Sequence, residues 1–219
     1  RPDVMNCLHP MANAEMAQAF DEFAANPDLW VAIVTGAGDK AFSAGNDLKF
    51  AASGQKSPVP MPSTGFGGLS SRYDLFKPVI AAVNGFAMGG GFMLVERTDL
   101  RLAVREAVFE VSEAKRWLLG GYNHGHIANL PYPIAMEMAL GFRFTAQRFY
   151  EVGFLNRLVE PDQLMPEAIR MAEHLLTLPP ASRVNTVHMM RQMRPTPGPD
   201  MQRLAAALHE HGDKTDLME

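Results

Sequence analysis

Two glycine-rich junctions are the parts of this 219-residue chain best suited to chemistry. One covers residues 43–48 and the other residues 87–92, and each comes after an apolar run that predicts a buried strand. The first turn of a helix has unpaired backbone N–H groups and the positive end of the helix dipole. If the two turns converge, they would bind an oxyanion without any side chain, and the three glycines at 89–91 would let a ligand carbonyl approach closely.

A second interpretation of the first junction is a nucleophilic serine. Residues 41–45 approximate the G-x-S-x-G elbow of serine hydrolases, with Ser43 as the nucleophile and histidines downstream as candidate bases. The elbow needs a strand that ends at the serine, whereas the predicted strand ends near Val34, and Ala41 stands in place of the first glycine. Ser43 is therefore interpreted as a turn residue, and the hydrolase is kept as an alternative.

Two further motifs give weaker signals. Residues 36–41 match the G-x-G-x-x-A form of the dinucleotide fingerprint, but a Ser/Gly loop follows where a helix should begin, and residues 55–62 lack the expected carboxylate. His124 and His126 flank a glycine, but no Cys, Asp or Glu nearby would complete a metal shell. The sequence therefore predicts neither NAD binding nor a metal site, and it favours a polar loop around the histidines.

Strands and helices alternate around these junctions. The apolar, β-branched runs that predict strands are residues 30–34, 79–83, 100–104 and 155–159, the first two buried on both faces. The helical patterns cover residues 10–26, 133–140 and 146–152, a helix that opens at 89–91, and helices from 162 onward. Residues 39–45 and 53–68 are predicted loops, the second mobile and on the surface. This order favours an α/β core over residues 1–160 and a helical C-terminal region over residues 161–219.

Composition and charge exclude several classes of protein. Apolar residues make up 47% and charged residues 20% of the chain, which is typical of a globular protein. The net charge of -4 leaves no basic excess for a nucleic-acid backbone. The apolar run 78–95 contains a proline, an asparagine and four glycines, which predict strand, turn and helix instead of a membrane span. The single cysteine, Cys7, cannot form an internal disulfide, and we expect a cytoplasmic protein.

Two long motifs, read in order, resemble those of the crotonase, or enoyl-CoA hydratase/isomerase, superfamily. They are residues 36–49 and 77–92, and the resemblance continues through residues 109–121 and 135–161. Within the superfamily, residues 67–75 are most similar to carnitinyl-CoA dehydratase-type members. Because members usually carry a further strand pair at the start and a final helix at the end, we expect this chain to be trimmed at both ends.

The resemblance implies a spiral of ββα units that assembles into trimers or hexamers, with the C-terminal region as the oligomerisation part. It implies an acyl-CoA thioester as substrate, with coenzyme A as part of that substrate and no permanently bound cofactor. The thioester carbonyl would lie between the backbone N–H groups of Asn46 and Gly90. The residues implied to border the adenine, the pantetheine and a phosphate of coenzyme A are Ala44, Asp47, Leu48 and Lys49.

The proton-transfer groups are the unusual part of the resemblance. Hydration needs a base for water and an acid for the α-carbon, and hydratases of this family use two glutamates. Glu113 matches the second of them, but Met93 stands at the first, and methionine transfers no proton. Glu96 lies three residues beyond Met93 and could replace the missing carboxylate if the helix turns it inward. The resemblance thus implies an enoyl-CoA hydratase/dehydratase or isomerase that uses Glu113, or else an impaired homologue that only binds CoA thioesters.

Overall fold

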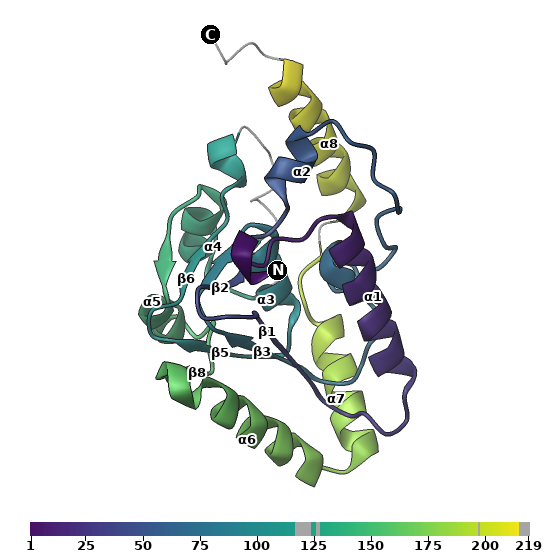
Figure 1. Ribbon diagram of the computed structural model, residues 1–219, viewed down its shortest axis with the longest axis vertical. Helices are drawn as coiled ribbons and strands as arrows, with labels where there is room; N and C mark the ends of the chain where they lie inside the picture. The colour runs from purple at the N-terminus through teal and green to yellow at the C-terminus, as the bar shows by residue number, and fades with distance from the viewer. Residues whose placement is uncertain (117–123, 126–127, 197, 215–219) are drawn as a thin grey trace.

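The computed structural model describes residues 1–116, 124–125, 128–196 and 198–214. Within these residues the strands form two four-stranded sheets, which share one winding path of the chain (Figure 1). The chain places one strand in the first sheet, the next strand in the second sheet and then a helix, before it returns to the first sheet. Successive ββα units of this kind confirm the predicted α/β fold and its spiral arrangement.

The two sheets differ in the direction of one edge strand. The first sheet is parallel, and its strands in order are β1 (Ala32–Thr35), β3 (Val79–Val83), β5 (Leu100–Val104) and β8 (Arg157–Val159). The second sheet contains β2 (Ala41–Ser43), β4 (Phe86–Met88), β6 (Val108–Glu110) and β7 (Phe144–Thr145), and β7 runs antiparallel to β6. The helices that complete the units are α2 (Leu48–Ala52), α3 (Gly90–Arg97) and the 3-10 helix η3 (Glu113–Arg116).

The middle of the first sheet is fully buried in the core. Each residue of β3 has 0% of its surface exposed, since β1 and β5 flank it and α6 (Leu164–Thr177) packs against it. A continuous apolar run suits a parallel strand that is covered on both faces. The bounds predicted for β3 and β5 are confirmed residue for residue.

An aromatic cluster anchors the second sheet to α3. The ring of Phe92 on α3 lies 5.3 Å from that of Phe154, centroid to centroid, and the rings of Phe149 and Phe154 are 4.6 Å apart. Phe109 of β6 packs on Phe149 at 4.8 Å. All four side chains are at most 2% exposed, so α3 is held against rigid aromatic packing where the candidate site begins.

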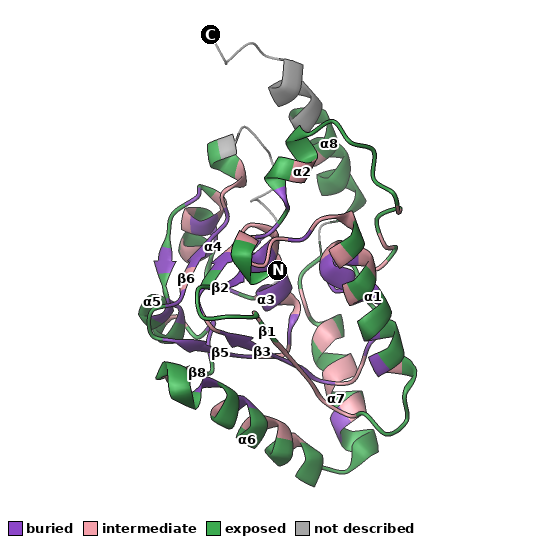
Figure 2. Cartoon of the chain, viewed as in Figure 1, coloured by how far each residue is buried: buried purple, intermediate pink, exposed green. Residues whose placement is uncertain are grey.

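Helices cover the outside of this core and form the C-terminal part (Figures 1 and 2). The remaining helices are α1 (Pro10–Ala25), α4 (Tyr132–Ala139), α5 (Ala146–Glu151), α7 (Pro180–Gln192) and α8 (Pro199–Lys214), with 3-10 helices η1 (Pro2–Val4), η2 (Phe66–Gly68) and η5 (Pro161–Gln163). Figure 2 shows buried strands in both sheets and an exposed outer face on α6. The helical character of the C-terminal region is confirmed by α6, α7 and α8.

Several sequence-based predictions of the fold are wrong in detail. Residues 39–45 are not all loop, because Ala41–Ser43 form the fully buried strand β2. Strand β1 is only half-buried rather than covered on both faces, since it is the edge strand of its sheet. The end of the 53–68 loop turns inward as η2, where Gly67 and Gly68 are buried. The predicted Gly/His-rich loop lies partly outside the described residues.

No described helix combines the length and the apolar composition that a bilayer crossing requires. The apolar run at 78–95 divides into β3, β4 and α3, as its glycines and asparagine predicted.

Candidate active site

The two glycine-rich junctions meet at one edge of the second sheet. Strands β2 and β4 are parallel neighbours, so their carboxyl ends, and the turns that follow, lie side by side. A Cβ atom added to Gly45 would stand 2.6 Å from the carbonyl oxygen of Met88 and 2.8 Å from the nitrogen of Gly90. A Cβ atom on Gly91 would stand 2.1 Å from the carbonyl oxygen of Ser43. The two backbones therefore touch where only glycine fits.

Each junction presents a free backbone donor at the position that the resemblance implies. On the first, the N–H of Leu8 donates to Gly45 at 2.8 Å and the N–H of Asp47 donates to Leu8 at 3.0 Å, which fixes the peptide units on both sides of Asn46. On the second, Gly90 begins α3, so its N–H has no acceptor within the helix. Neither the N–H of Asn46 nor that of Gly90 donates to any other described residue. Both N–H groups are therefore available to an acceptor from outside the described residues.

The close approach of the junctions predicts a large effect of Gly45→Ala. Gly45 and Gly54 both have positive φ angles, 86° and 68°, so alanine costs about 1 to 2 kcal/mol of backbone strain at either position. Only at Gly45 does the added methyl group also collide with backbone, because nothing lies within 4 Å of a Cβ atom on Gly54. We expect Gly45→Ala to lose more stability in urea unfolding, and to lose thioester turnover, while Gly54→Ala keeps turnover. Equal losses in both variants would contradict the contact.

Glu113 lies beside the second junction. It begins η3, directly after β6, and its Oε1 atom is 3.8 Å from a Cβ atom placed on Gly89. Its Oε2 atom is buried and has no hydrogen-bond partner among the described residues. The side chain is 19% exposed, so the carboxylate borders both solvent and protein. Glu113 therefore brings a carboxylate oxygen without a hydrogen-bond partner among the described residues to the second junction.

Glu96 points inward, as a replacement for the missing glutamate requires, but its carboxylate meets His124 rather than the junctions. The Nδ1 atom of His124 lies 2.8 Å from Glu96 Oε1, and the N–H of Gly125 donates to Oε2 at 3.3 Å. On the other side of the ring, Nε2 lies 4.0 Å from Glu113 Oε1. Met93 is half-buried on the same helix as Glu96. The interpretation of His124 as a plain polar loop residue missed this contact with a residue far away in sequence.

The residues implied to border coenzyme A divide into two groups. Asp47 is buried and engaged, because its carboxylate accepts from the N–H of Phe50 at 3.1 Å and pairs with Arg1 at 2.9 Å. The hydrogen bond from Phe50 and the charge of Arg1 hold the pKa of Asp47 below its ordinary value. Leu48 and Lys49 are exposed and Ala44 is half-buried, so these side chains remain open to a ligand.

Ser43 shows how the structure uses the residue that resembled a nucleophile. Strand β2 does end at Ser43, contrary to the prediction that no strand reaches it. The hydroxyl donates to the carbonyl of Asn6 at 2.8 Å and accepts from the N–H of Gly45 at 3.1 Å, and the residue is 3% exposed. Both hydrogen bonds shape the first junction, so the geometry favours a turn residue over a nucleophile.

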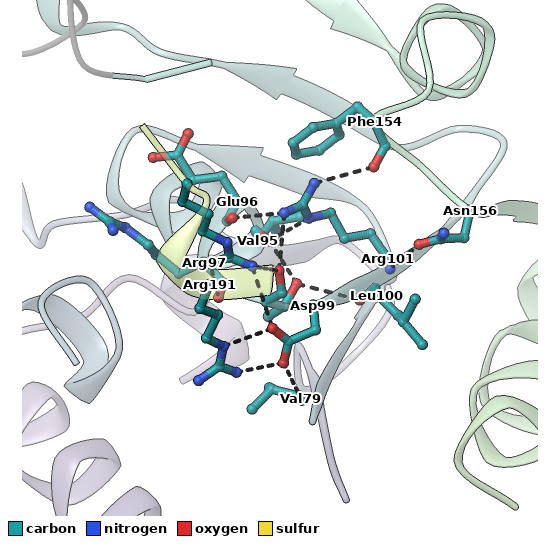
Figure 3. A network of polar contacts seen from close by, with 12 residues as sticks. Val79, Val95, Glu96, Arg97, Asp99, Leu100, Arg101, Phe154, Asn156 and Arg191 are labelled. Carbon is teal, nitrogen blue, oxygen red and sulfur yellow. Dashed lines mark hydrogen bonds and ion pairs between the residues drawn. The ribbon is translucent and has the colours of Figure 1, made fainter. Parts of the chain in front are cut away.

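A buried network of arginines fixes the far end of α3 (Figure 3). Arg101 donates to the carbonyl oxygens of Val95 at 3.0 Å, Glu96 at 2.8 Å and Thr98 at 3.0 Å. These acceptors include the last carbonyl groups of the helix, which lack partners within it. Burial, together with the charge of the nearby Arg194, lowers the pKa of Arg101 to about 10, so this residue remains a cation at neutral pH.

Asp99 joins this network to α7 and to the first sheet. Its carboxylate receives two hydrogen bonds from Arg191, at 2.8 and 2.5 Å, and one from the N–H of Val79 at 2.9 Å. Arg194 adds donors to the carbonyls of Arg97 at 3.1 Å and Thr98 at 2.9 Å. The network therefore holds α3, whose first turn carries Gly90, in one position on the sheets.

Known proteins are similar to this chain in sequence and in fold. The family model described as enoyl-CoA hydratase/isomerase matches residues 1–218. A carnitinyl-CoA dehydratase of Salmonella enteritidis PT4 is 39% identical over 180 residues, which cover 80% of this chain and 68% of that protein. A carnitinyl-CoA dehydratase from Mycobacterium avium 104 superposes with a TM-score of 0.86 at 30% identity, covering 99% of this chain and 87% of that one. An enoyl-CoA hydratase from Mycobacterium tuberculosis H37Rv superposes with a TM-score of 0.80 at 33% identity, covering 99% of this chain and 85% of that one.

Proposed function

Since this chain belongs to the enoyl-CoA hydratase/isomerase family and is a hydratase- or lyase-type enzyme of acyl-CoA substrates, we propose that it works by holding a thioester enolate between the N–H groups of Asn46 and Gly90. The observation that carries this proposal is the contact between the junctions, at which a Cβ atom on Gly45 would stand 2.8 Å from the nitrogen of Gly90. One preorganised donor of this kind is worth about 2.7 to 4 kcal/mol of transition-state stabilisation. A pair supplies much of what enolate formation requires.

Glu113 moves the proton in this mechanism. In hydration, a water oxygen bonds to the β-carbon, the water proton passes to Glu113 Oε2, and the electron pair of the double bond moves onto the thioester oxygen as an enolate. The enolate then collapses, and the proton passes from Glu113 to the α-carbon. Dehydration is the reverse sequence. Isomerisation adds no water: Glu113 removes a proton from one carbon atom, the resulting dienolate is held at the same two N–H groups, and the proton returns to another carbon atom. One carboxylate suffices because it acts in turn as base and acid.

The substrate lies along the first junction and under the 53–68 loop. Phe66 covers the second junction, since a Cβ atom on Gly90 would stand 2.6 Å from the Phe66 ring, and this ring supports a pocket wall for the acyl chain. Ala44, Leu48 and Lys49 border the coenzyme A part, which enters with the substrate. Asp47 holds the junction in shape through the N–H of Phe50.

The helices α6 and α7 are the proposed contact between subunits of a homotrimer or hexamer. They carry exposed apolar side chains that a monomer leaves in water, and such patches are typical of protein interfaces. These side chains are Met165, Ile169, Leu176, Met189 and Met190.

The reaction is tested by mass spectrometry of saturated and α,β-unsaturated acyl-CoAs after incubation with the protein in heavy water. Addition of heavy water identifies a hydratase, loss of water identifies a dehydratase, and α-deuteration without another change identifies enolate formation. The second candidate, an impaired homologue that binds CoA thioesters, is favoured by Met93 and predicts binding without any change in the thioester. Labelling of Ser43 by a fluorophosphonate, with release of free coenzyme A, would support a hydrolase instead and would overturn the proposal.

A further inference from the structure

A buried chain of three side chains leads from the inside of α3 to the candidate active site. Glu96 contacts His124, and His124 faces Glu113, with separations of 2.8 and 4.0 Å. We propose that His124 is a positioning residue whose protonated ring orients the carboxylate of Glu113, and that Glu96 fixes the ring for this task. The inference rests on the proposed function, because it assigns a role in the proton transfer by Glu113.

The buried carboxylate of Glu96 is the first support for this role. Its side chain is 0% exposed, and a carboxylate at such a place is costly unless charged or hydrogen-bonding partners surround it. Both oxygens have such partners, namely the His124 ring and the N–H of Gly125. The backbone carbonyl of Glu96 is also bound by Arg101, so the residue is fixed at both ends (Figure 3).

The orientation of the ring follows from the chemistry of its neighbours. An ionised carboxylate only accepts hydrogen bonds, so the contact with Glu96 assigns a proton to Nδ1 of His124. The Nε2 atom then faces Glu113 Oε1, and two unprotonated acceptors would repel each other. A second proton therefore lies on Nε2, and the charged ring faces Oε1 across 4.0 Å as an ion pair.

The charges around His124 favour this proton. Burial alone would favour the neutral ring, but the negative charges of Glu96 and Glu113 outweigh both burial and the opposing charge of Arg97. The pKa of His124 consequently lies above its ordinary value. The remaining aromatic neighbour, Phe92, meets the ring at 6.1 Å between centroids and brings no charge.

The charged ring of His124 determines which oxygen of Glu113 reacts. Because Oε1 faces the imidazolium, Oε2 is left as the unpartnered oxygen that receives a proton from the substrate or water and returns it. The proton on His124 is not consumed in this cycle, so the step balances without another reactant. Glu96 and His124 thus keep the single carboxylate of Glu113 oriented. In an enzyme with two glutamates, a second carboxylate would take part in the proton transfer.

Histidine NMR tests the chain without any substrate. The pH titration of the His124 ring is followed in the intact protein, in Glu96→Gln and in Glu113→Gln, and the His124→Gln variant identifies the signal. We expect the ring to stay protonated above the ordinary histidine range and to lose its proton at lower pH in both carboxamide variants. A ring that is neutral in the intact protein, or that titrates identically in Glu96→Gln, overturns the inference.

Kinetics then test the role in turnover. Since the protonated pair is the active form, we expect kcat to fall as pH rises through the pKa of His124, and this limb to move to lower pH in Glu96→Gln. His124→Gln is expected to lower kcat about a hundredfold, to remove the limb and to leave KM within about threefold, whereas a merely structural role would leave the shape of the profile intact. The exposed His174→Gln is the matched control and should change neither kcat nor the profile.

The outcomes separate this inference from the proposed function. If the protein binds thioesters but changes none of them, the proposed function fails, and the NMR titration still decides whether the proton is held. If turnover occurs and His124→Gln keeps the pH profile of the intact protein, the role of His124 is overturned while the proposed function stands. Thermal unfolding of each variant shows whether it is folded. If His124→Gln does not fold, the pH profile of Glu96→Gln tests the inference in its place.

Discussion

Glu113→Gln is expected to lower the turnover of acyl-CoA substrates by about 10²- to 10⁴-fold, with little change in their binding. Glutamine has the shape of glutamate but can neither take up nor return a proton. The two N–H groups at Asn46 and Gly90 are unchanged by this substitution, so the thioester should still bind. Steady-state kinetics with the thioester found active in the heavy-water panel, together with binding titrations, measure the two effects separately.

Glu110→Gln is the matched control, since Glu110 lies three residues earlier, at the end of β6. Its carboxylate accepts hydrogen bonds from Arg143 and Lys115, at 2.6 and 3.1 Å. These cations outweigh burial and keep the pKa of Glu110 below its ordinary value. We expect this variant to lose some stability but to retain turnover within a few-fold. Turnover retained in Glu113→Gln, or lost equally in both variants, would contradict the assignment of Glu113.

Arg101→Met is expected to produce the largest loss of stability, about 3 kcal/mol, because it leaves the buried carbonyl group of Glu96 without a donor and removes one donor each from the carbonyl groups of Val95 and Thr98. Methionine fills a similar volume but donates no hydrogen bond. Urea unfolding at neutral pH measures the loss. Arg101→Lys should recover only part of it, since an ammonium group cannot reproduce the planar set of donors of a guanidinium group.

The control for this prediction is Arg105→Met, four residues along the same segment. Arg105 is 55% exposed and pairs with Glu160 at the surface, so its loss should cost less than about 1 kcal/mol. A similar small loss for Arg101→Met would show that the helix end tolerates unpaired carbonyl groups. Beyond stability, we expect Arg101→Met to lower turnover, because α3 also carries Gly90 in its first turn.

The parts of the fold with a long sequence signal could be predicted. The five apolar residues of β3 and the helical spacing of α1 determine their own elements, since burial on both faces or on one face leaves a clear pattern. Strands β2, β4 and β6 have three residues each, which is too short for any periodicity. For this reason residues 39–45 were misread as a loop and the strand that ends at Ser43 was missed.

The candidate site divides in the same way. The two glycine-rich junctions could be predicted, because glycines and helix starts leave a signal in the local sequence, whereas the role of Glu113 stays a prediction from the resemblance. The partner of Glu96 could not, because His124 lies 28 positions away along the chain. One signal was present, namely a glutamate in a helix whose neighbours Leu94 and Val95 are core residues. A charge at such a position requires a buried partner somewhere in the fold.

The winding of the chain places each candidate site residue directly after a different strand of the second sheet. Asn46 follows β2, Gly90 follows β4 and Glu113 follows β6, and these three strands are consecutive neighbours in the second sheet. In the proposed mechanism, the thioester carbonyl is therefore bound after the first two strands and the proton is moved after the third. A new side chain after β6 could change the reaction while the turns after β2 and β4 still bind the thioester. The architecture thus separates substrate binding from the choice of reaction.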